Sequence, residues 1–273
     1  MGQKERRIWM IRYLLAERGI DVQSEQCEIP AGEREQCDLP RALVNVREPE
    51  PIDETFLSVE SAYLQERLRE INVTDSAGIS VQLIAPRLGE RNSGIAVWQG
   101  DITTLQCDAI VNAANSGMTG CYVPNHHCID NAIHTVAGMR LRLECARIMR
   151  SKGRPEPIGA ATITPGCELP SRYVLHTVGP AMQTADPIPT EQDRSQLESC
   201  YLSCLEVATE HSLETLAFCS ISTGVFRCPI EEAANIAVRT VYDFLNNHET
   251  SVKKVIFDVF NERDAEIYKK IVE

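Results

Sequence analysis

The sequence predicts an α/β fold in which helices cover both faces of a largely parallel sheet, preceded by a small helical extension. Segments with the residue pattern of strands alternate with helix-like segments from about residue 80 onward. This alternation is typical of parallel sheets, because each crossover between parallel strands needs a helix. The residues before this part have the pattern of helices only. With 273 residues, the chain is long enough to bury a sizeable core.

The first part of the chain contains three helix-like segments. Residues 5–18 have the period of an amphipathic helix, and residues 39–46 could form a second, shorter one. Two prolines at about residue 50 break the chain, and residues 53–68 then roughly keep a helical period. We expect this extension to be a packing appendage without chemistry of its own.

The second part alternates regularly. Strands are expected at residues 81–84, 95–98, 109–111, 161–164, 173–178, 216–221 and 254–260. Helices are expected at residues 131–150, 197–211, 230–245 and 264–272. In parallel sheets, ligands bind outside the carboxyl ends of the strands, and the polar clusters of this sequence fall there.

The charge balance limits the partners. With 27 basic and 39 acidic residues, the net charge is -12, which disfavours binding to nucleic acids and to anionic membranes. A small anion remains possible, because backbone amides at the start of a helix bind phosphate groups without net positive charge. No apolar run approaches the length of a membrane span or of a signal-peptide core.

The 11 cysteines are odd in number, scattered and mostly surrounded by apolar residues. This distribution favours reduced thiols over a disulfide framework, and therefore a cytoplasmic protein. Cys200 and Cys204 lie one helical turn apart and are expected to be buried thiols. His134 and His176 lie on an apolar helix and an apolar strand, and we expect both to be core histidines.

A compact loop predicts a metal site. Cys121, His126 and Cys128 are close enough in sequence to surround one ion, and sulfur with imidazole is a ligand set that zinc prefers. Three protein ligands with an open fourth position are typical of catalytic zinc, whose bound water ionises near a pKa of about 7. The alternative is that these are ordinary loop residues that bind no metal. The spacing does not choose between the neighbouring histidines. Less natural fourth ligands are His127, Asp130 and His134.

Two other strand ends carry polar residues. Asp101 follows a strand and could accept a hydrogen bond from an exocyclic amine such as that of adenine, or simply cap a turn. Residues 220–229 join a strand to a helix through small residues that let backbone amides approach an anionic ligand. A plain strand-to-helix turn is the alternative there.

Taken together, these motifs resemble the macrodomain family of proteins that bind and hydrolyse ADP-ribose. The matching motifs occur in the family's order: Gly100-Asp-Ile-Thr103, Ala109-Ile-Val-Asn-Ala-Ala-Asn115, Asp130-Asn-Ala-Ile-His134, Gly159-Ala-Ala161, His176-Thr-Val-Gly-Pro180 and Ser222-Thr-Gly-Val-Phe226. The resemblance implies a three-layer α/β/α sandwich with a mixed, largely parallel central sheet over residues 82–273. Residues 1–81 would be the helical extension.

One departure from the common macrodomain pattern is informative. Residues 120–128 contain cysteine and histidine where most macrodomains have a glycine-rich loop. This loop is similar to that of a zinc-containing microbial subclass, whose members also carry a helical N-terminal extension. The resemblance selects Cys121, His126 and Cys128 as the ligands of one catalytic Zn²⁺.

The resemblance also implies a role for each remaining motif residue. Asp101 would bond the adenine amine, with Ile102 at a neighbouring ring edge. Asn115 would bond the hydroxyls of the distal ribose. Asp130 matches an aspartate that activates water in other hydrolytic macrodomains. The diphosphate loop would be Ser222, Thr223, Gly224 and Val225, with Phe226 against the distal ribose.

The function implied is zinc-dependent removal of mono-ADP-ribose from modified proteins, most simply from Asp or Glu side chains. The alternative is an ADP-ribose reader without turnover, in which a structural zinc shapes the loop. Some relatives in the subclass work beside a sirtuin-like ADP-ribosyltransferase and a lipoyl-carrier protein. We expect no nucleic-acid or membrane partner.

Overall fold

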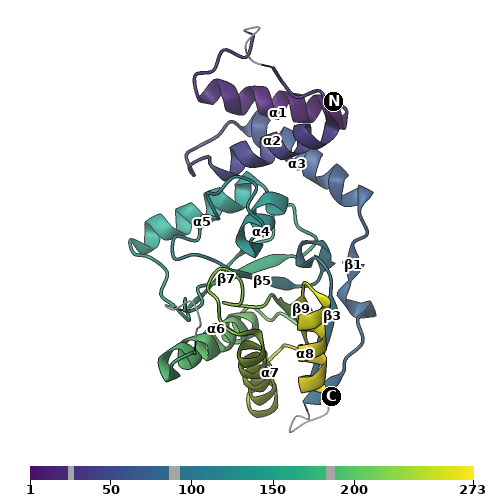
Figure 1. Cartoon of the computed structure of the whole chain (residues 1–273), viewed down its shortest axis with the longest axis vertical. Helices are drawn as coiled ribbons and strands as arrows, with labels where there is room; N and C mark the ends of the chain where they lie inside the picture. Colours follow the sequence, from purple (N-terminus) through teal and green to yellow (C-terminus); the bar gives the residue numbers. More distant parts are fainter. Residues whose placement is uncertain (24–27, 86–92, 183–187) are drawn as a thin grey trace.

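A seven-stranded mixed sheet forms the centre of the C-terminal part (Figure 1). The computed structural model describes residues 1–23, 28–85, 93–182 and 188–273. The strands are β2 (Leu83–Ala85), β3 (Ser93–Gln99), β5 (Ala109–Ala113), β6 (Ala161–Pro165), β7 (Tyr173–Thr177), β8 (Thr215–Phe218) and β9 (Lys254–Val259). Their order is β2-β3-β9-β8-β5-β7-β6. The edge strands β2 and β6 are antiparallel to their neighbours, whereas the other pairs are parallel.

Helices cover both faces of this sheet, as Figure 1 shows. One face carries α4 (Ile129–Ala137) and α5 (Met139–Lys152), and the other carries α6 (Glu191–Glu210), α7 (Ile230–Asn247) and α8 (Glu262–Val272). This arrangement confirms the predicted three-layer α/β/α fold with a mixed, largely parallel sheet. In the described part of the chain, no helix combines the length and apolarity needed to cross a membrane.

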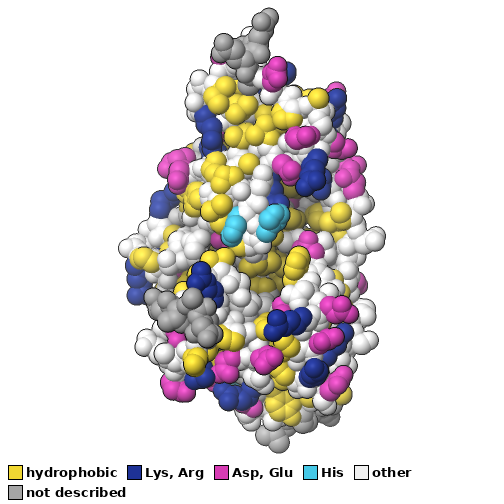
Figure 2. Space-filling model, in the orientation of Figure 1, with side chains coloured by type: hydrophobic (Ala, Val, Ile, Leu, Met, Phe, Trp, Pro, Cys, Tyr) yellow, Lys and Arg dark blue, Asp and Glu magenta, His cyan; other side chains and the backbone are white. Residues whose placement is uncertain are grey.

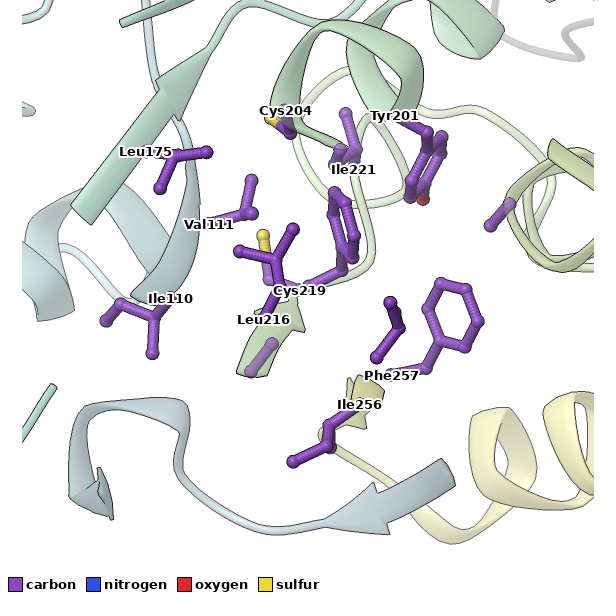
Figure 3. Close-up of a cluster of buried hydrophobic side chains, with 14 of the residues drawn as sticks. Ile110, Val111, Leu175, Tyr201, Cys204, Leu216, Cys219, Ile221, Ile256 and Phe257 are labelled. Atoms are coloured by element: carbon purple, nitrogen blue, oxygen red, sulfur yellow. The ribbon is translucent and has the colours of Figure 1, made fainter. Parts of the chain in front are cut away.

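The central strands are apolar on both sides because helices cover both faces of the sheet. Parallel strands covered on both faces have almost no side chain facing water. Figure 3 shows buried aliphatic, aromatic and thiol side chains from the central strands, the loop after β8 and α6, and Cys200 and Cys204 are buried as predicted. The labelled residues are Ile110, Val111, Leu175, Tyr201, Cys204, Leu216, Cys219, Ile221, Ile256 and Phe257.

The prediction of one helix over residues 131–150 is wrong, because the chain breaks at Gly138. This glycine has φ 78°, a left-handed conformation that residues with a Cβ rarely adopt. The first helix ends there and α5 begins at Met139. The strand expected at residues 216–221 is also shorter, since β8 ends at Phe218. The chain then leaves the sheet to form a loop.

Short elements join the two parts of the chain. Strand β1 (Thr74–Asp75) pairs in parallel with β4 (Leu105–Gln106). Two short 3-10 helices are η1 (Ser76–Gly78) and η2 (Ile102–Thr104). Strand pairing with the C-terminal part therefore begins at Thr74, several residues before the boundary expected from the sequence.

Three helices form the N-terminal extension, which lies over α4 and α5 (Figure 1). They are α1 (Gln3–Glu17), α2 (Glu33–Asn45) and α3 (Glu54–Glu70), so the second helix is longer than the predicted 39–46. The extension has an apolar cluster of its own, which one residue of α5 completes. Its buried members are Met10, Ile11, Leu14, Leu43, Phe56, Leu57, Val59, Tyr63 and Met139.

A buried arginine joins the extension to the sheet domain. Arg142 of α5 is 2% exposed, and its Nη1 donates hydrogen bonds to the carbonyls of Val44, Asn45 and Arg47 at 2.7, 2.9 and 2.8 Å. These carbonyls lie at the C-terminal end of α2, where the helix dipole favours a cation. One guanidinium thus satisfies several carbonyls that the helix itself leaves unpaired.

A buried carboxyl group makes the reciprocal contact. Glu60 of α3 accepts a hydrogen bond of 2.8 Å from the backbone N–H of Met139, at the start of α5. Burial raises the pKa of Glu60 from 4.5 to about 7, although this hydrogen bond and the charges of Arg140 and Arg142 lower it in part. The side chain therefore stays protonated in the folded protein over a range in which the unfolded chain has already ionised.

We predict that Arg142→Ala lowers the free energy of unfolding by about 3 kcal/mol, because buried carbonyls lose a charged donor. Urea denaturation followed by circular dichroism measures this change. Arg140→Ala is the matched control, since Arg140 makes an exposed ion pair of 3.2 Å with Glu54, and it should lower stability by less than about 1 kcal/mol. Equal effects of the two substitutions would contradict the role given to Arg142.

A second prediction concerns pH. Between pH 4.5 and 7 the unfolded chain binds less proton at Glu60 than the folded protein does, so this group lowers stability as pH rises. From the two pKa values, wild type should lose about 3 kcal/mol more than Glu60→Gln between pH 4.5 and pH 8. Gln keeps the acceptor for Met139 and does not titrate. If the free energies of unfolding of wild type and Glu60→Gln changed equally with pH over this range, Glu60 would not be buried in its protonated form.

Candidate functional site

The carboxyl ends of the parallel strands bring the candidate residues to one edge of the sheet. Asp101 follows β3, Asn115 follows β5, Ser222 follows β8 and Phe260 follows β9. Figure 2 shows that the surface is hollowed near the middle of the molecule, with hydrophobic side chains in the hollow and histidine side chains at its rim. The hollow lies between the half that carries the extension and the half that carries α6 to α8 (Figures 1 and 2).

The structure brings together the three cysteine and histidine residues selected as metal ligands. The ligand atoms of Cys121, His126 and Cys128 all lie within 4.8 Å of one another, and Cys121 Sγ is 3.5 Å from His126 Nδ1. A tetrahedral zinc with Zn–S of about 2.3 Å and Zn–N of about 2.0 Å separates such atoms by about 3.6 Å. The donor set therefore fits zinc. His127 is exposed and outside this group.

The chemistry of the two thiols also fits a cation. The pKa of Cys128 is raised to about 11, because burial and the nearby charges of Cys121 and Asp130 outweigh a hydrogen bond from the backbone N–H of Asn131. A thiol with so high a pKa is a poor anion when it is alone. A bound divalent cation reverses this balance, because a coordinating thiol is deprotonated outright.

Local backbone geometry shapes the loop. Asn125 has φ 51°, a left-handed conformation that asparagine tolerates better than most residues. Gly120 has φ 88°, and a Cβ there would lie 2.9 Å from the His134 ring and 3.0 Å from Arg142 Nη2. At the other end of the loop, Cys128 caps α4, its Sγ accepting a hydrogen bond of 3.4 Å from Asn131 N.

Asp130 and Asn115, the residues expected to act on the ribose, contact each other. Asp130 is 5% exposed in the first turn of α4, where the helix dipole favours a carboxylate. Its Oδ2 accepts a hydrogen bond of 3.2 Å from Asn115 Nδ2, which also donates to the Gly120 carbonyl at 3.0 Å. Asn115 Oδ1 accepts from the backbone N–H of Gly117 at 2.9 Å and keeps a second lone pair. The pKa of Asp130 is raised to about 6, because burial outweighs the amide hydrogen bonds and the Arg142 charge, which lower it.

Sequence reasoning missed Asn112 as a site residue. It is fully buried in β5, and its Nδ2 donates to Asp130 Oδ1 at 2.8 Å and lies 3.2 Å from His176 Nδ1. His176 Nε2 is in turn 2.9 Å from the Thr164 hydroxyl. An asparagine inside an otherwise apolar strand was the available signal, because a buried amide needs polar partners.

The buried histidines support this network and do not reach solvent. His134 and His176 are buried, as predicted for core histidines, and burial lowers the pKa of His176 to about 3. Their ring nitrogens and Cys145 Sγ lie within 4.8 Å of one another. Burial raises the pKa of Cys145 above its usual range. We interpret this group as packing beneath Asp130.

Asp101 caps η2 and still keeps one oxygen for a ligand. Its Oδ1 accepts hydrogen bonds from Thr103 N at 2.9 Å and Thr103 Oγ1 at 2.6 Å. Both bonds use the same oxygen, and Oδ2 accepts none from the described residues. Ile102 beside it is 2% exposed. The cap and the expected adenine contact are therefore compatible.

The loop after β8 has the form of an anion site. Ser222 has φ 64°, and its carbonyl accepts a hydrogen bond of 2.8 Å from Cys228 N, which closes the loop. Gly224 and Val225 are exposed. Within the described part of the chain, the backbone N–H groups of residues 224–226 donate to no other backbone group. The loop leads directly into the N-terminal end of α7, which favours an anion.

Phe260 is a second residue that the motifs did not reveal. It is 85% exposed directly after β9, beside the end of β3, because Gln99 pairs with Val259. The adjacent Asp258 lies near Asp101, whose charge adds to burial in raising the pKa of Asp258 to about 8. An aromatic side chain left in water at a strand end offers a stacking surface for a base. A large apolar residue at a strand end, just before a capping asparagine, was the only sequence signal.

A cavity of about 390 Å³ adjoins Asp101 and lies between the extension and the sheet domain. Residues of α2, α3, η2 and α4 line it, among them Arg41, Tyr63 and Thr135. A larger cavity of about 730 Å³ lies at α6 and α7 and includes none of the candidate residues. The size of a cavity therefore does not identify the candidate site.

Fold and site together define an α/β protein whose polar motif residues lie at the carboxyl ends of its parallel strands, beside a cluster of two cysteines and one histidine. The family model of the Macro domain matches residues 111–237. A protein named protein-ADP-ribose hydrolase from Treponema medium is 47% identical over 272 residues, which cover 100% of both chains. The chain therefore belongs to the macro domain family.

Two further comparisons agree. A protein of the same name from Staphylococcus aureus (strain MSSA476) is 47% identical over 242 residues, covering 89% of this chain and 86% of that protein. The structure of a Trypanosoma brucei macrodomain in complex with ADP-ribose has a TM-score of 0.63 and is 29% identical. That match covers 82% of this chain and 92% of the other.

Proposed function

We propose that this protein is a zinc-dependent hydrolase that removes mono-ADP-ribose from the Asp and Glu side chains of modified proteins. Hydrolysis of ADP-ribosyl linkages follows from the full-length similarity to proteins named for that activity. The dependence on zinc and the linkage are our further steps. The observation that carries them is the cluster of Cys121, His126 and Cys128, which ends two residues before Asp130.

Each part of ADP-ribose has a matching group at the sheet edge. Asp101 Oδ2 accepts from the exocyclic amine of adenine, Ile102 contacts a neighbouring ring edge, and Phe260 stacks on the base. The backbone N–H groups of the loop between β8 and α7, together with the N-terminal end of α7, bind the diphosphate. The loop residues in this role are Ser222, Thr223, Gly224 and Val225, with Phe226 against the distal ribose.

The reaction takes place where Asn115 meets residues 120–128, which we call the metal-ligand loop. Asn115 Oδ1 accepts a hydrogen bond from a hydroxyl of the distal ribose, and its Nδ2 is held by Asp130. Asp130 thus keeps the carboxamide at a single orientation, which positions the sugar for attack at the anomeric carbon. When bound, the zinc ion supplies a Lewis acid that polarises a hydroxyl or water beside the ribose.

The site offers no exposed general acid among Asp130 and His134, which favours a carboxylate leaving group. An Asp or Glu side chain leaves as an anion with an ordinary pKa of about 4 and needs no proton. A serine or arginine leaving group is far more basic and needs a general acid within reach. Asp130 and His134 are 5% and 3% exposed, beneath the surface that the substrate contacts. A release assay on acidic, serine and arginine linkages should therefore show turnover of the acidic linkage.

We predict that metal removal and Cys128→Ser each lower kcat at least 100-fold while ADP-ribose binding changes little, because the phosphate and adenine contacts lie on other loops. Elemental analysis should find one zinc per wild-type chain. Cys167→Ser is the matched control, since Cys167 is a half-buried cysteine outside the metal-ligand group. Calorimetry with ADP-ribose and a single-turnover release assay provide the two readouts.

Two outcomes would overturn the proposal in different ways. Full activity of the zinc-free protein would remove the metal from the reaction. Joint loss of folding and ADP-ribose binding, without turnover in any form of the protein, would favour the alternative of a reader with a structural zinc.

We predict that Phe260→Ala raises KM about tenfold and leaves kcat unchanged, because stacking of a base on an aromatic ring contributes about 1–3 kcal/mol. Phe260→Tyr keeps the ring and should retain the wild-type KM. Steady-state kinetics with an ADP-ribosylated protein measure both. An unchanged KM in Phe260→Ala would exclude this residue from the base site.

The partnership with a sirtuin-like ADP-ribosyltransferase and a lipoyl-carrier protein stays a prediction from the resemblance, as does the cytoplasmic location. A release assay with an ADP-ribosylated lipoyl carrier as substrate tests the partnership directly.

A further inference from the structure

The N-terminal extension contacts the metal-ligand loop directly, which the sequence did not predict. Arg41 and Asn45 lie one turn apart on α2, on the side that faces α4 and the loop. Their side chains bond to the backbone of residues 125 and 126, within the segment that holds the three candidate ligands.

Arg41 connects the middle of the loop to the start of α4. Its Nη2 donates to the carbonyl of His126 at 3.1 Å and to Asn131 Oδ1 at 2.9 Å. Asn131 is fully buried, and its Nδ2 donates to the Val123 carbonyl at 3.2 Å. Its backbone N–H is the donor to Cys128 Sγ. One guanidinium nitrogen therefore fixes the backbone of one ligand and the residue that holds another.

Asn45 supports the loop where its backbone is strained. The Oδ1 of this 1% exposed side chain accepts a hydrogen bond of 3.0 Å from Asn125 N, and its Nδ2 lies 3.3 Å from the Thr135 hydroxyl of α4. Asn125 is the residue with φ 51° that turns the chain toward His126. Asparagine tolerates this conformation better than most residues, and the hydrogen bond from its backbone N–H to Asn45 stabilises it further.

The position of α2 is itself fixed from the sheet domain. Arg142 bonds the carbonyls of Val44 and Asn45 and that of Arg47, and its guanidinium lies 4.8 Å from the centre of the Tyr122 ring in the loop. Arg142 thus contacts both the helix and the loop that the helix supports. Arg41 and Asn45 cannot move away from the loop without breaking this contact.

We propose that Arg41 and Asn45 of the extension are positioning residues that hold the loop in its metal-binding form. The inference rests on the proposed zinc site. Groups that orient metal ligands from outside typically change metal affinity or activity 10- to 100-fold when they are removed. The extension is then part of the working site and not the inert appendage that the sequence suggested.

The test uses the full chain with paired substitutions. Arg41→Met keeps the aliphatic stem and removes the donors, whereas Arg41→Lys keeps a positively charged donor on a slightly shorter side chain. Arg34→Ala is the matched control, because Arg34 lies on the same helix, is 94% exposed and, among the described residues, forms an ion pair with Asp38 alone. For each protein, competition with a colorimetric chelator gives the zinc Kd, kinetics at saturating zinc give kcat and KM, and thermal unfolding gives Tm.

Arg41→Met should weaken zinc binding about 10- to 100-fold and lower kcat with KM unchanged, while Arg41→Lys recovers most of both. Asn45→Asp keeps the acceptor for Asn125 and should stay closer to wild type than Asn45→Ala. A wild-type zinc Kd and kcat in Arg41→Met would overturn the inference, and so would a lowered Tm with an unchanged zinc Kd. Full activity of zinc-free wild type would instead overturn the proposed function, and the zinc Kd of Arg41→Met against Arg34→Ala would still decide the role of the extension.

Discussion

The buried carboxylate of Asp130 connects the sheet, the helix and the candidate site. It lies in the first turn of α4, where the helix dipole favours it, and accepts hydrogen bonds from Asn112 inside β5 and from Asn115 beyond it. Charged hydrogen bonds of this kind are strong only when every partner is in place. Because Cys128 caps the same helix two residues earlier, the orientation of α4 sets both the amide that we propose to face the ribose and one of the proposed metal ligands.

The extension and the sheet domain hold each other through polar groups at helix ends. Arg142 of α5 caps the C-terminal end of α2, Glu60 of α3 caps the start of α5, and Arg41 of α2 reaches the loop before α4. Each group is buried or half-buried. Removing one of them would leave its partner with neither a hydrogen bond nor water, which lowers the stability of the fold. This interface makes the position of the loop depend on residues far away in the sequence.

Local patterns predicted most of the fold, and the failures share one cause. The period of the apolar residues located the central strands and the helices of the sheet domain. It did not show the break at Gly138, because glycine there is needed for a left-handed φ beside the Glu60 carboxylate, a neighbour 78 residues away. The apolar period also made the prediction for α2 too short. Glu33 to Asp38 form the first turns of that helix but are too polar to show such a period.

The sequence by itself determined the alternating α/β pattern, the order of the polar strand ends and the short spacing of Cys121, His126 and Cys128, since these are local properties of the chain. Only the tertiary structure decided that His126 faces Cys121 while His127 faces solvent, that Asn112 supports Asp130 and that Phe260 stands beside the end of β3. It also decided that helix α2 holds the loop. These relations depend on how parallel strands and distant helices meet, and no local pattern of residues encodes that.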